Sequence, residues 1–193
     1  MVELVPGRER IFFDWVTAAE VEAAIKHEHI AFPPDEADSP EQFRYRFKHA
    51  KHLFLGAFAA SDQAKGRKLI GHVCGTQSPL TYYTKESMSV HVASSPSICV
   101  HSVVLLESYQ KKGIGLQMMR EYLLRIQRQI SSSEGEYRHG KPERVLLVTH
   151  DEVRPFYEKA GFICKGKSDV ALGQGVWYEM SYPLKQSSSS TSK

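Results

Sequence analysis

Hydrophobic residues occur along the chain in short runs separated by polar, glycine-containing or proline-containing segments, a pattern typical of β-strands. The runs at 53–60 and 69–76 flank one polar loop, so they predict a pair of antiparallel strands. The run at 98–106 is almost continuously apolar and predicts a buried central strand. Shorter strands are expected at 11–13, 145–148, 162–163 and 177–182.

Two capped helices are expected between the first strand and the first strand pair. Thr17 and Glu20 have the spacing of a capping box that opens a helix. This helix must end before the segment Phe32-Pro33-Pro34, because a residue that precedes proline is pushed away from helical angles. Ser39 is expected to cap the second helix, and Gln42 to complete a second capping box.

Two further helices are expected in the second half of the chain. Apolar residues at helical spacing predict a long helix after Gly115, and a short helix over 155–160 is expected to end at Gly161. The pattern of segment 77–97 is weak and predicts a loop with a partial strand. Segment 131–141, rich in serine, glycine and charge, is interpreted as a flexible connection rather than a domain boundary.

The order of these elements predicts one α/β (α+β) domain in which helices flank a single mixed sheet. We place this domain at 10–184, after an N-terminal extension at 1–9. The serine-rich segment 185–193 is predicted to be a disordered tail.

Composition narrows the function classes. The chain has 193 residues, and 25 Lys plus Arg against 22 Asp plus Glu give a net charge of +3, too even for a dedicated nucleic-acid binder. No window resembles a membrane span or a signal peptide, so we expect a cytoplasmic monomer without a nucleic-acid or membrane partner. The 3 cysteines lie far apart, and the 9 histidines lack ligand spacing, so no disulfide framework and no metal are expected.

The segment from Gln110 to Gly115 carries the clearest chemical signal. It lies between a predicted buried strand and an amphipathic helix, where free amides, the helix dipole and Lys111 with Lys112 favour a diphosphate. On the glycines alone, a turn that merely requires glycine is equally consistent. A P-loop would need Gly-Lys-Ser or Gly-Lys-Thr, and a dinucleotide fingerprint would need a small residue where Met118 stands.

This segment resembles the central motif of the GCN5-related N-acetyltransferase (GNAT) superfamily: Gln or Arg, two residues, Gly, one residue, then Gly or Ala. The segment 153–162, with its Phe156-Tyr157 pair before Gly161-Phe162, resembles a later element of the same superfamily. Together with segments 31–34, 100–104 and 177–180, these motifs resemble the fungal members of the serotonin (arylalkylamine) N-acetyltransferase branch. The resemblance extends from Arg10 to Leu184.

The resemblance implies a single mixed, mostly antiparallel and twisted sheet flanked by helices. It also implies transfer of acetyl from acetyl-CoA to the primary amine of a small molecule, by direct attack in a ternary complex. The strand backbone at Val103, Val104 and Leu105 would hold the pantetheine arm of the cofactor. The pyrophosphate would be held by Gln110, Lys111, Lys112, Gly113, Ile114, Gly115 and Leu116.

Two residues match catalytic positions of the resembled family. His101 matches one of two histidines that take the proton from the amine, and Cys99 stands in place of the second. Tyr157 matches a tyrosine that lies beside the cofactor sulfur and protonates the departing thiolate. Read from the residues alone, a core histidine and a buried aromatic side chain are the structural alternatives.

The acceptor is less constrained by sequence. The positions that match the amine pocket of the resembled family are Phe32, Pro33, Val103, Val148 and Trp177. Such an apolar pocket favours an arylalkylamine. A polyamine is the alternative, because Asp35, Glu36 and Asp38 follow the same loop. A noncatalytic CoA-binding module, suggested by Cys99, and a protein acetyltransferase also stay open.

Overall fold

The computed structural model describes residues 9–60, 66–132, 137, 139–170 and 172–185. Residues 186–193 of the expected serine-rich tail and residues 1–8 of the N-terminal extension lie outside the described residues. The same holds for 133–136 and 138 in the expected flexible connection.

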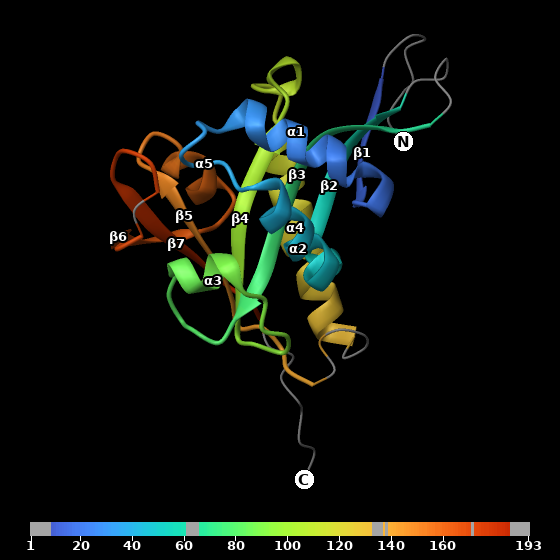
Figure 1. Cartoon of the computed structure of the whole chain (residues 1–193). Coiled ribbons are helices and arrows are strands. Elements are labelled where there is room, and N and C mark those ends of the chain that lie inside the picture. The colour runs from blue at the N-terminus through green and yellow to red at the C-terminus, as the bar shows by residue number, and fades with distance from the viewer. Residues whose placement is uncertain (1–8, 61–65, 133–136, 138, 171, 186–193) are drawn as a thin grey trace.

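In the described part of the chain, seven strands form one sheet in the order β1-β2-β3-β4-β5-β7-β6 (Figure 1). Strands β4 and β5 run parallel, and the other neighbouring pairs run antiparallel. The prediction of a single mixed, mostly antiparallel sheet is therefore confirmed. The strands are β1 Arg10–Trp15, β2 Phe54–Ala60, β3 Lys68–Ser78, β4 Ser97–Leu105, β5 Arg144–His150, β6 Ile163–Lys167 and β7 Trp177–Pro183.

Helices cover both faces of the sheet (Figure 1). Helices α1 (Val21–Ala31) and α2 (Pro40–Ala50) pack on one face, where Phe43 meets Phe54 and Phe58 in a buried cluster. Helix α4 (Ile114–Ser132) packs on the other face, in a larger cluster that also contains Tyr157 of α5 (Arg154–Lys159). Two hydrophobic cores thus hold the sheet between the helix layers.

The predicted starts of the first two helices and the end of the first before Phe32 are confirmed, with one correction at α2, whereas α4 begins at Ile114, before the predicted start after Gly115, and α5 spans Arg154–Lys159 instead of 155–160. Thr17 and Glu20 form the expected capping box, which opens a short 3-10 turn (Ala18–Glu20) that continues into α1. Ser39 caps α2 by accepting a hydrogen bond from the backbone of Gln42. The side chain of Gln42, however, donates to the carbonyl of Met88, 3.1 Å away, so it does not complete a second capping box.

The segment 77–97 was predicted to be a loop with a partial strand and is more ordered than that. Strand β3 continues to Ser78, and a short helix, α3 (Lys85–Ser89), follows. Thr84 and Ser87 cap this helix reciprocally. Its carbonyl at Met88 accepts hydrogen bonds from Gln42 and Arg46 of α2, so contacts from a distant helix hold it.

The central strand β4 departs from its neighbours at two places. Its register with β3 shifts, since Ser102 lies opposite Cys74 and Val100 lies opposite Gly75, which leaves His101 as the extra residue of a β-bulge. Its ladder with β5 ends at Cys99, which pairs with Leu146. Beyond this point, no described strand pairs with the edge of β4 that faces β5, and the two strands diverge.

Candidate active site

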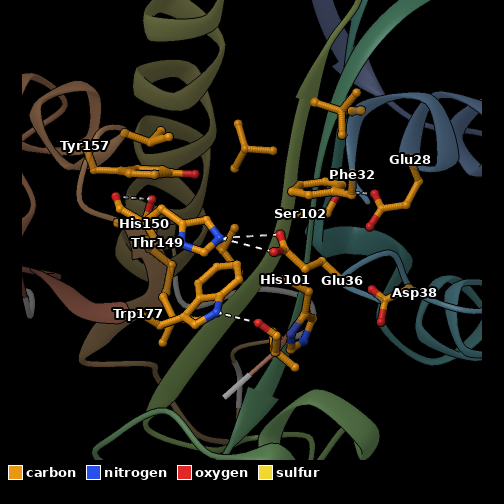
Figure 2. A pocket seen from close by; sticks show the side chains of 18 of the residues that line it. Glu28, Phe32, Glu36, Asp38, His101, Ser102, Thr149, His150, Tyr157 and Trp177 are labelled. Atoms are coloured by element: carbon orange, nitrogen blue, oxygen red, sulfur yellow. Dashed lines mark hydrogen bonds and ion pairs between the residues drawn. The ribbon is translucent and has the colours of Figure 1, made fainter. Parts of the chain in front are cut away.

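A cavity of about 240 Å³ lies where β4 and β5 diverge (Figure 2). Side chains from α1, β4, β5, α5 and β7 line it. Four of the five residues that sequence places around the acceptor, Phe32, Val103, Val148 and Trp177, are in its wall. The fifth, Pro33, lines an adjoining outer cavity that shares Phe32 and the pair Glu36 and His150 with the inner one.

A third cavity, of about 680 Å³, lies beside the inner one, toward the start of α4. The inner and third cavities share Val103, Leu105, Gln110, Val153 and Tyr157, so they adjoin each other along these residues. Most of the predicted cofactor residues line this third cavity: Val103, Leu105, Gln110, Lys111, Gly113, Gly115, Leu116 and Tyr157.

Three of the predicted cofactor residues lie elsewhere. Val104 lines the inner cavity. Lys112 lines neither cavity, and its ammonium group donates to the carbonyl of Ser108 at 2.8 Å. Ile114 is buried at the start of α4 and also lines neither cavity. Contacts of the last two with a ligand would therefore be made through the backbone.

The loop between β4 and α4 is shaped to expose backbone amides. Lys111 and Gly113 both have positive φ angles, 58° and 79°, which turn the chain sharply before α4 begins at Ile114. The side chain of Gln110 donates to the carbonyl of Leu105 at 2.8 Å and ties the loop to the end of β4. The first amides of α4 are then free to bind an anion.

His101 in the β4 bulge has protein partners at both ring nitrogens. Nε2 lies 2.7 Å from the Thr76 hydroxyl, and Nδ1 lies 2.7 Å from the Tyr83 hydroxyl. Desolvation lowers the pKa of His101 well below its ordinary value, and the Arg46 guanidinium lowers it further. The neutral ring therefore donates to one hydroxyl and accepts from the other.

Tyr157 lies on α5 and points its hydroxyl into the cavity (Figure 2). Its ring packs edge-on against Phe156 and Phe162, with centroids 5.0 and 5.8 Å away. Burial raises the pKa of Tyr157 above its ordinary value, so the hydroxyl carries its proton at neutral pH. Within the described residues, no hydrogen bond engages that hydroxyl, which leaves it available to a ligand.

Several cavity residues were missed from the sequence. His150, at the end of β5, lies 3.3 Å from a carboxylate oxygen of Glu36, and its ring stacks on Trp177 at 3.9 Å between centroids. Glu28 lies on the buried face of α1, and Ser102 faces it from β4. A signal existed for Glu28, because it follows Ala24 by four positions on the apolar stripe of its helix.

Two negative findings hold within the described residues. No helix there has the length and apolar character needed to cross a membrane. No group of three or more His, Cys, Asp or Glu side chains is arranged there for a metal ion. The three cysteines Cys74, Cys99 and Cys164 are free thiols, and the first two are buried.

A strand edge that no described strand pairs with, leading to the amides of a helix N-terminus, is an arrangement that suits an extended ligand with a phosphate group. Residues 56–164 match the family described as "Acetyltransferase (GNAT) domain". The chain belongs to this family, because the match spans more than half of its length. The superfamily resemblance drawn from the motifs is thereby confirmed.

Individual relatives are distant. Serotonin N-acetyltransferase from Mesocricetus auratus is 24% identical over 145 residues, which are 75% of this chain and 62% of that protein. The loading GNATL domain of CurA from Lyngbya majuscula has a TM-score of 0.70 at 12% identity, over 90% of this chain and 98% of that one. The structure of yncA from Salmonella typhimurium with its cofactor acetyl-CoA has a TM-score of 0.59 at 11% identity, over 92% and 95%. These structures establish the shared fold.

Proposed function

We propose that this protein is an acetyl-CoA-dependent N-acetyltransferase that acts on the primary amine of a small molecule by direct attack in a ternary complex. The observation that carries the proposal is that the inner cavity and the third cavity adjoin each other. The diphosphate-compatible loop at Gly113 opens into one cavity, an aromatic-lined space forms the other, and Val103 and Tyr157 line both. Two substrates bound in these cavities would meet beside Tyr157.

The residues present fit acetyl-CoA. The unpaired edge of β4 at 103–105 offers backbone groups to an extended pantetheine arm, as an additional strand would use them. The loop at 110–116 offers amides and the Lys111 ammonium to the pyrophosphate. When bound, acetyl-CoA supplies an activated acetyl thioester. A backbone amide of β4 directed at the carbonyl oxygen would stabilise the developing charge without reorganisation.

Two side chains are assigned to proton movement in this proposal. An alkylamine has a pKa of about 10.4 and reaches the site as an ammonium, which must lose a proton before it attacks. His101 is proposed to relay this proton rather than to keep it, because a neutral ring that donates to one hydroxyl and accepts from the other can pass a proton on between Thr76 and Tyr83. Tyr157 is the proposed acid for the departing thiolate, because its hydroxyl is protonated and faces the cavity.

An arylalkylamine is the acceptor class that the inner cavity favours. Phe32 and Trp177 supply aromatic walls and Val148 an aliphatic one. The indole Nε1 of Trp177 donates to the carbonyl of Leu172 at 2.7 Å, which fixes the orientation of this wall. A flat ring carrying an aminoethyl chain matches a narrow cavity of this composition.

A polyamine is the second candidate, and the outer cavity favours it. Glu36, Asp151 and Glu152 all line that cavity, next to the mouth of the inner one. A second ammonium group of a long acceptor would lie among these carboxylates. The acceptor end would then occupy the inner cavity in the same way as an arylalkylamine.

One competition assay tests the proposal. Tryptamine and spermidine are supplied together with acetyl-CoA, thiol release is followed, and the acetylated products are separated by mass spectrometry. We expect acetyltryptamine as the main product. Consumption of neither amine contradicts the branch assignment, whereas binding of acetyl-CoA without thiol release across a broad amine panel favours a noncatalytic CoA-binding module.

A further inference from the structure

Glu28 is a buried carboxylate in the wall of the inner cavity. It lies on α1 with only 2% of its surface exposed, on the same helix face as Ala24 and Ile25. Its carboxylate points from α1 toward Ser102 on β4, next to Phe32 (Figure 2). Burial of a carboxylate costs several kcal/mol unless other groups compensate its charge.

Ser102 and His72 contact one oxygen of this carboxylate. The Ser102 hydroxyl donates to Oε2 of Glu28. Nε2 of His72 lies 3.0 Å from the Ser102 hydroxyl oxygen and 3.4 Å from Oε2 of Glu28. Within the described residues, no hydrogen bond engages the other oxygen, Oε1, and the residue lines the cavity.

His72 is the third member of this buried cluster. Its ring is fully buried, and Nδ1 has no hydrogen-bond partner among the described residues. Nε2, which contacts both Ser102 and Glu28, is the ring nitrogen that faces the carboxylate.

The other two carboxylates of the inner cavity differ from Glu28. The guanidinium of Arg46, 1% exposed, forms an ion pair with Asp38 and neutralises it. Glu36, with 10% of its side chain exposed, faces His150 at the mouth of the cavity. Among the described residues, both oxygens of Asp38 and both oxygens of Glu36 have hydrogen-bond partners, whereas Glu28 keeps Oε1 without one.

We propose that Glu28 is the residue that binds the ammonium group of the acceptor amine, and that Ser102 and His72 are positioning residues that hold its carboxylate toward the cavity. This assignment rests on the proposed function, and it adds the requirement that the acceptor enters as a cation. Oε1 of Glu28 accepts a hydrogen bond from the bound ammonium, while Phe32 beside it contacts the apolar part of the molecule. The cationic ligand would then pair with a carboxylate that the fold buries.

A pair of probes that differ in charge tests the assignment. Tryptamine and the neutral alcohol tryptophol are titrated into the CoA-saturated protein, and their dissociation constants are compared by calorimetry at pH 7. Because a hydrogen bond between charged groups contributes about 1.5–3 kcal/mol, wild type is expected to bind tryptamine roughly 10- to 100-fold more tightly than tryptophol. Glu28→Gln, which keeps the shape of the side chain, should reduce this ratio to about one.

Matched variants separate a binding role from a structural one. Glu41→Gln changes an 81% exposed carboxylate on α2 and should leave the ratio unchanged. Ser102→Ala should lower the ratio while the affinity for tryptophol stays the same, because only the carboxylate loses its support. Thermal unfolding of each variant verifies that the protein is folded.

The outcomes distinguish the two proposals. Wild type without a preference for tryptamine, or an equal preference in wild type and Glu28→Gln, would overturn the assignment of Glu28. A preference that depends on Glu28, in a protein that releases no CoA thiol with any amine, would support the assignment and reject acetyl transfer.

Discussion

Nδ1 of His101 lies 2.7 Å from the hydroxyl oxygen of Tyr83, and this contact places the imidazole in the wall of the cavity. The Tyr83 hydroxyl also donates to the carbonyl of Val100 at 3.1 Å, so it ties the ring to the bulge of β4. Burial, which removes water from the ring, lowers the pKa of His101. Charge on this histidine is therefore unfavourable in the folded state.

Stability should consequently fall in acid as His101 resists protonation. The unfolded chain binds a proton below pH about 6.5, whereas the folded chain with its lowered pKa does not, so the free energy of unfolding decreases as pH falls below that value. The slope per histidine is at most about 1.4 kcal/mol per pH unit. Urea unfolding of wild type and His101→Gln between pH 5 and pH 8 measures it.

The variant should show a shallower slope, not a flat one. His27 contributes in the same direction, because burial lowers its pKa to about 4, and it is present in both proteins. Identical slopes in wild type and His101→Gln would show that His101 takes up its proton in the folded state. The absolute stability of the variant does not enter this comparison.

Replacement of Tyr157 by Phe should lower turnover while acetyl-CoA affinity changes little. The ring packing against Phe156 and Phe162 is retained in Tyr157→Phe, and only the hydroxyl in the cavity is lost. Loss of a general acid typically lowers kcat by about 10²- to 10⁴-fold. Steady-state kinetics with the amine that proves active measures kcat, and calorimetry measures acetyl-CoA binding. Unchanged kcat would remove Tyr157 from the proposed mechanism.

Alanine at Gly113 and at Gly115 should have different effects on stability. Gly113 has a φ angle of 79°, so Gly113→Ala strains the backbone by about 1–2 kcal/mol. Gly115 lies in α4, and a Cβ there would meet Phe156 at an ordinary 3.5 Å, so Gly115→Ala should leave stability equal or slightly higher. Chemical unfolding of the two variants checks this difference.

Acetyl-CoA affinity should decrease in both glycine variants if the ligand phosphate approaches the backbone of this loop. Gly115→Ala is the more informative variant, because its fold is unstrained and a loss of affinity then reports the ligand contact. Tight acetyl-CoA binding by Gly115→Ala would place the pyrophosphate away from the start of α4.

Removal of the buried Arg46 should destabilise the fold strongly. Its guanidinium pairs with Asp38 and donates to the carbonyl of Met88 on α3. Arg46→Met leaves Asp38 as a buried charge without its partner, which costs about 3–5 kcal/mol. The double variant Arg46→Met/Asp38→Asn should recover part of that loss in urea unfolding. A double variant no more stable than Arg46→Met would show that the carboxylate charge is not the cause.

Local rules made much of the fold predictable from sequence. Capping at Thr17 and Ser39, the prolines after α1 and the apolar stripe of α4 depend on residues a few positions apart, and all of them are observed. The strand, glycine turn and helix around the motif at 110–115 could likewise be predicted, because they follow one another directly in the chain.

Contacts between distant segments decided the rest. The sequence by itself determined which segments are strands and helices and where a diphosphate would fit, since these features depend on near neighbours in the chain. Only the tertiary structure placed β7 between β5 and β6, positioned α3 through hydrogen bonds from α2, and set His101 in a bulge. It alone brought Glu28, His72 and Ser102 together from three elements, because the burial and charge balance of a side chain depend on what packs against it.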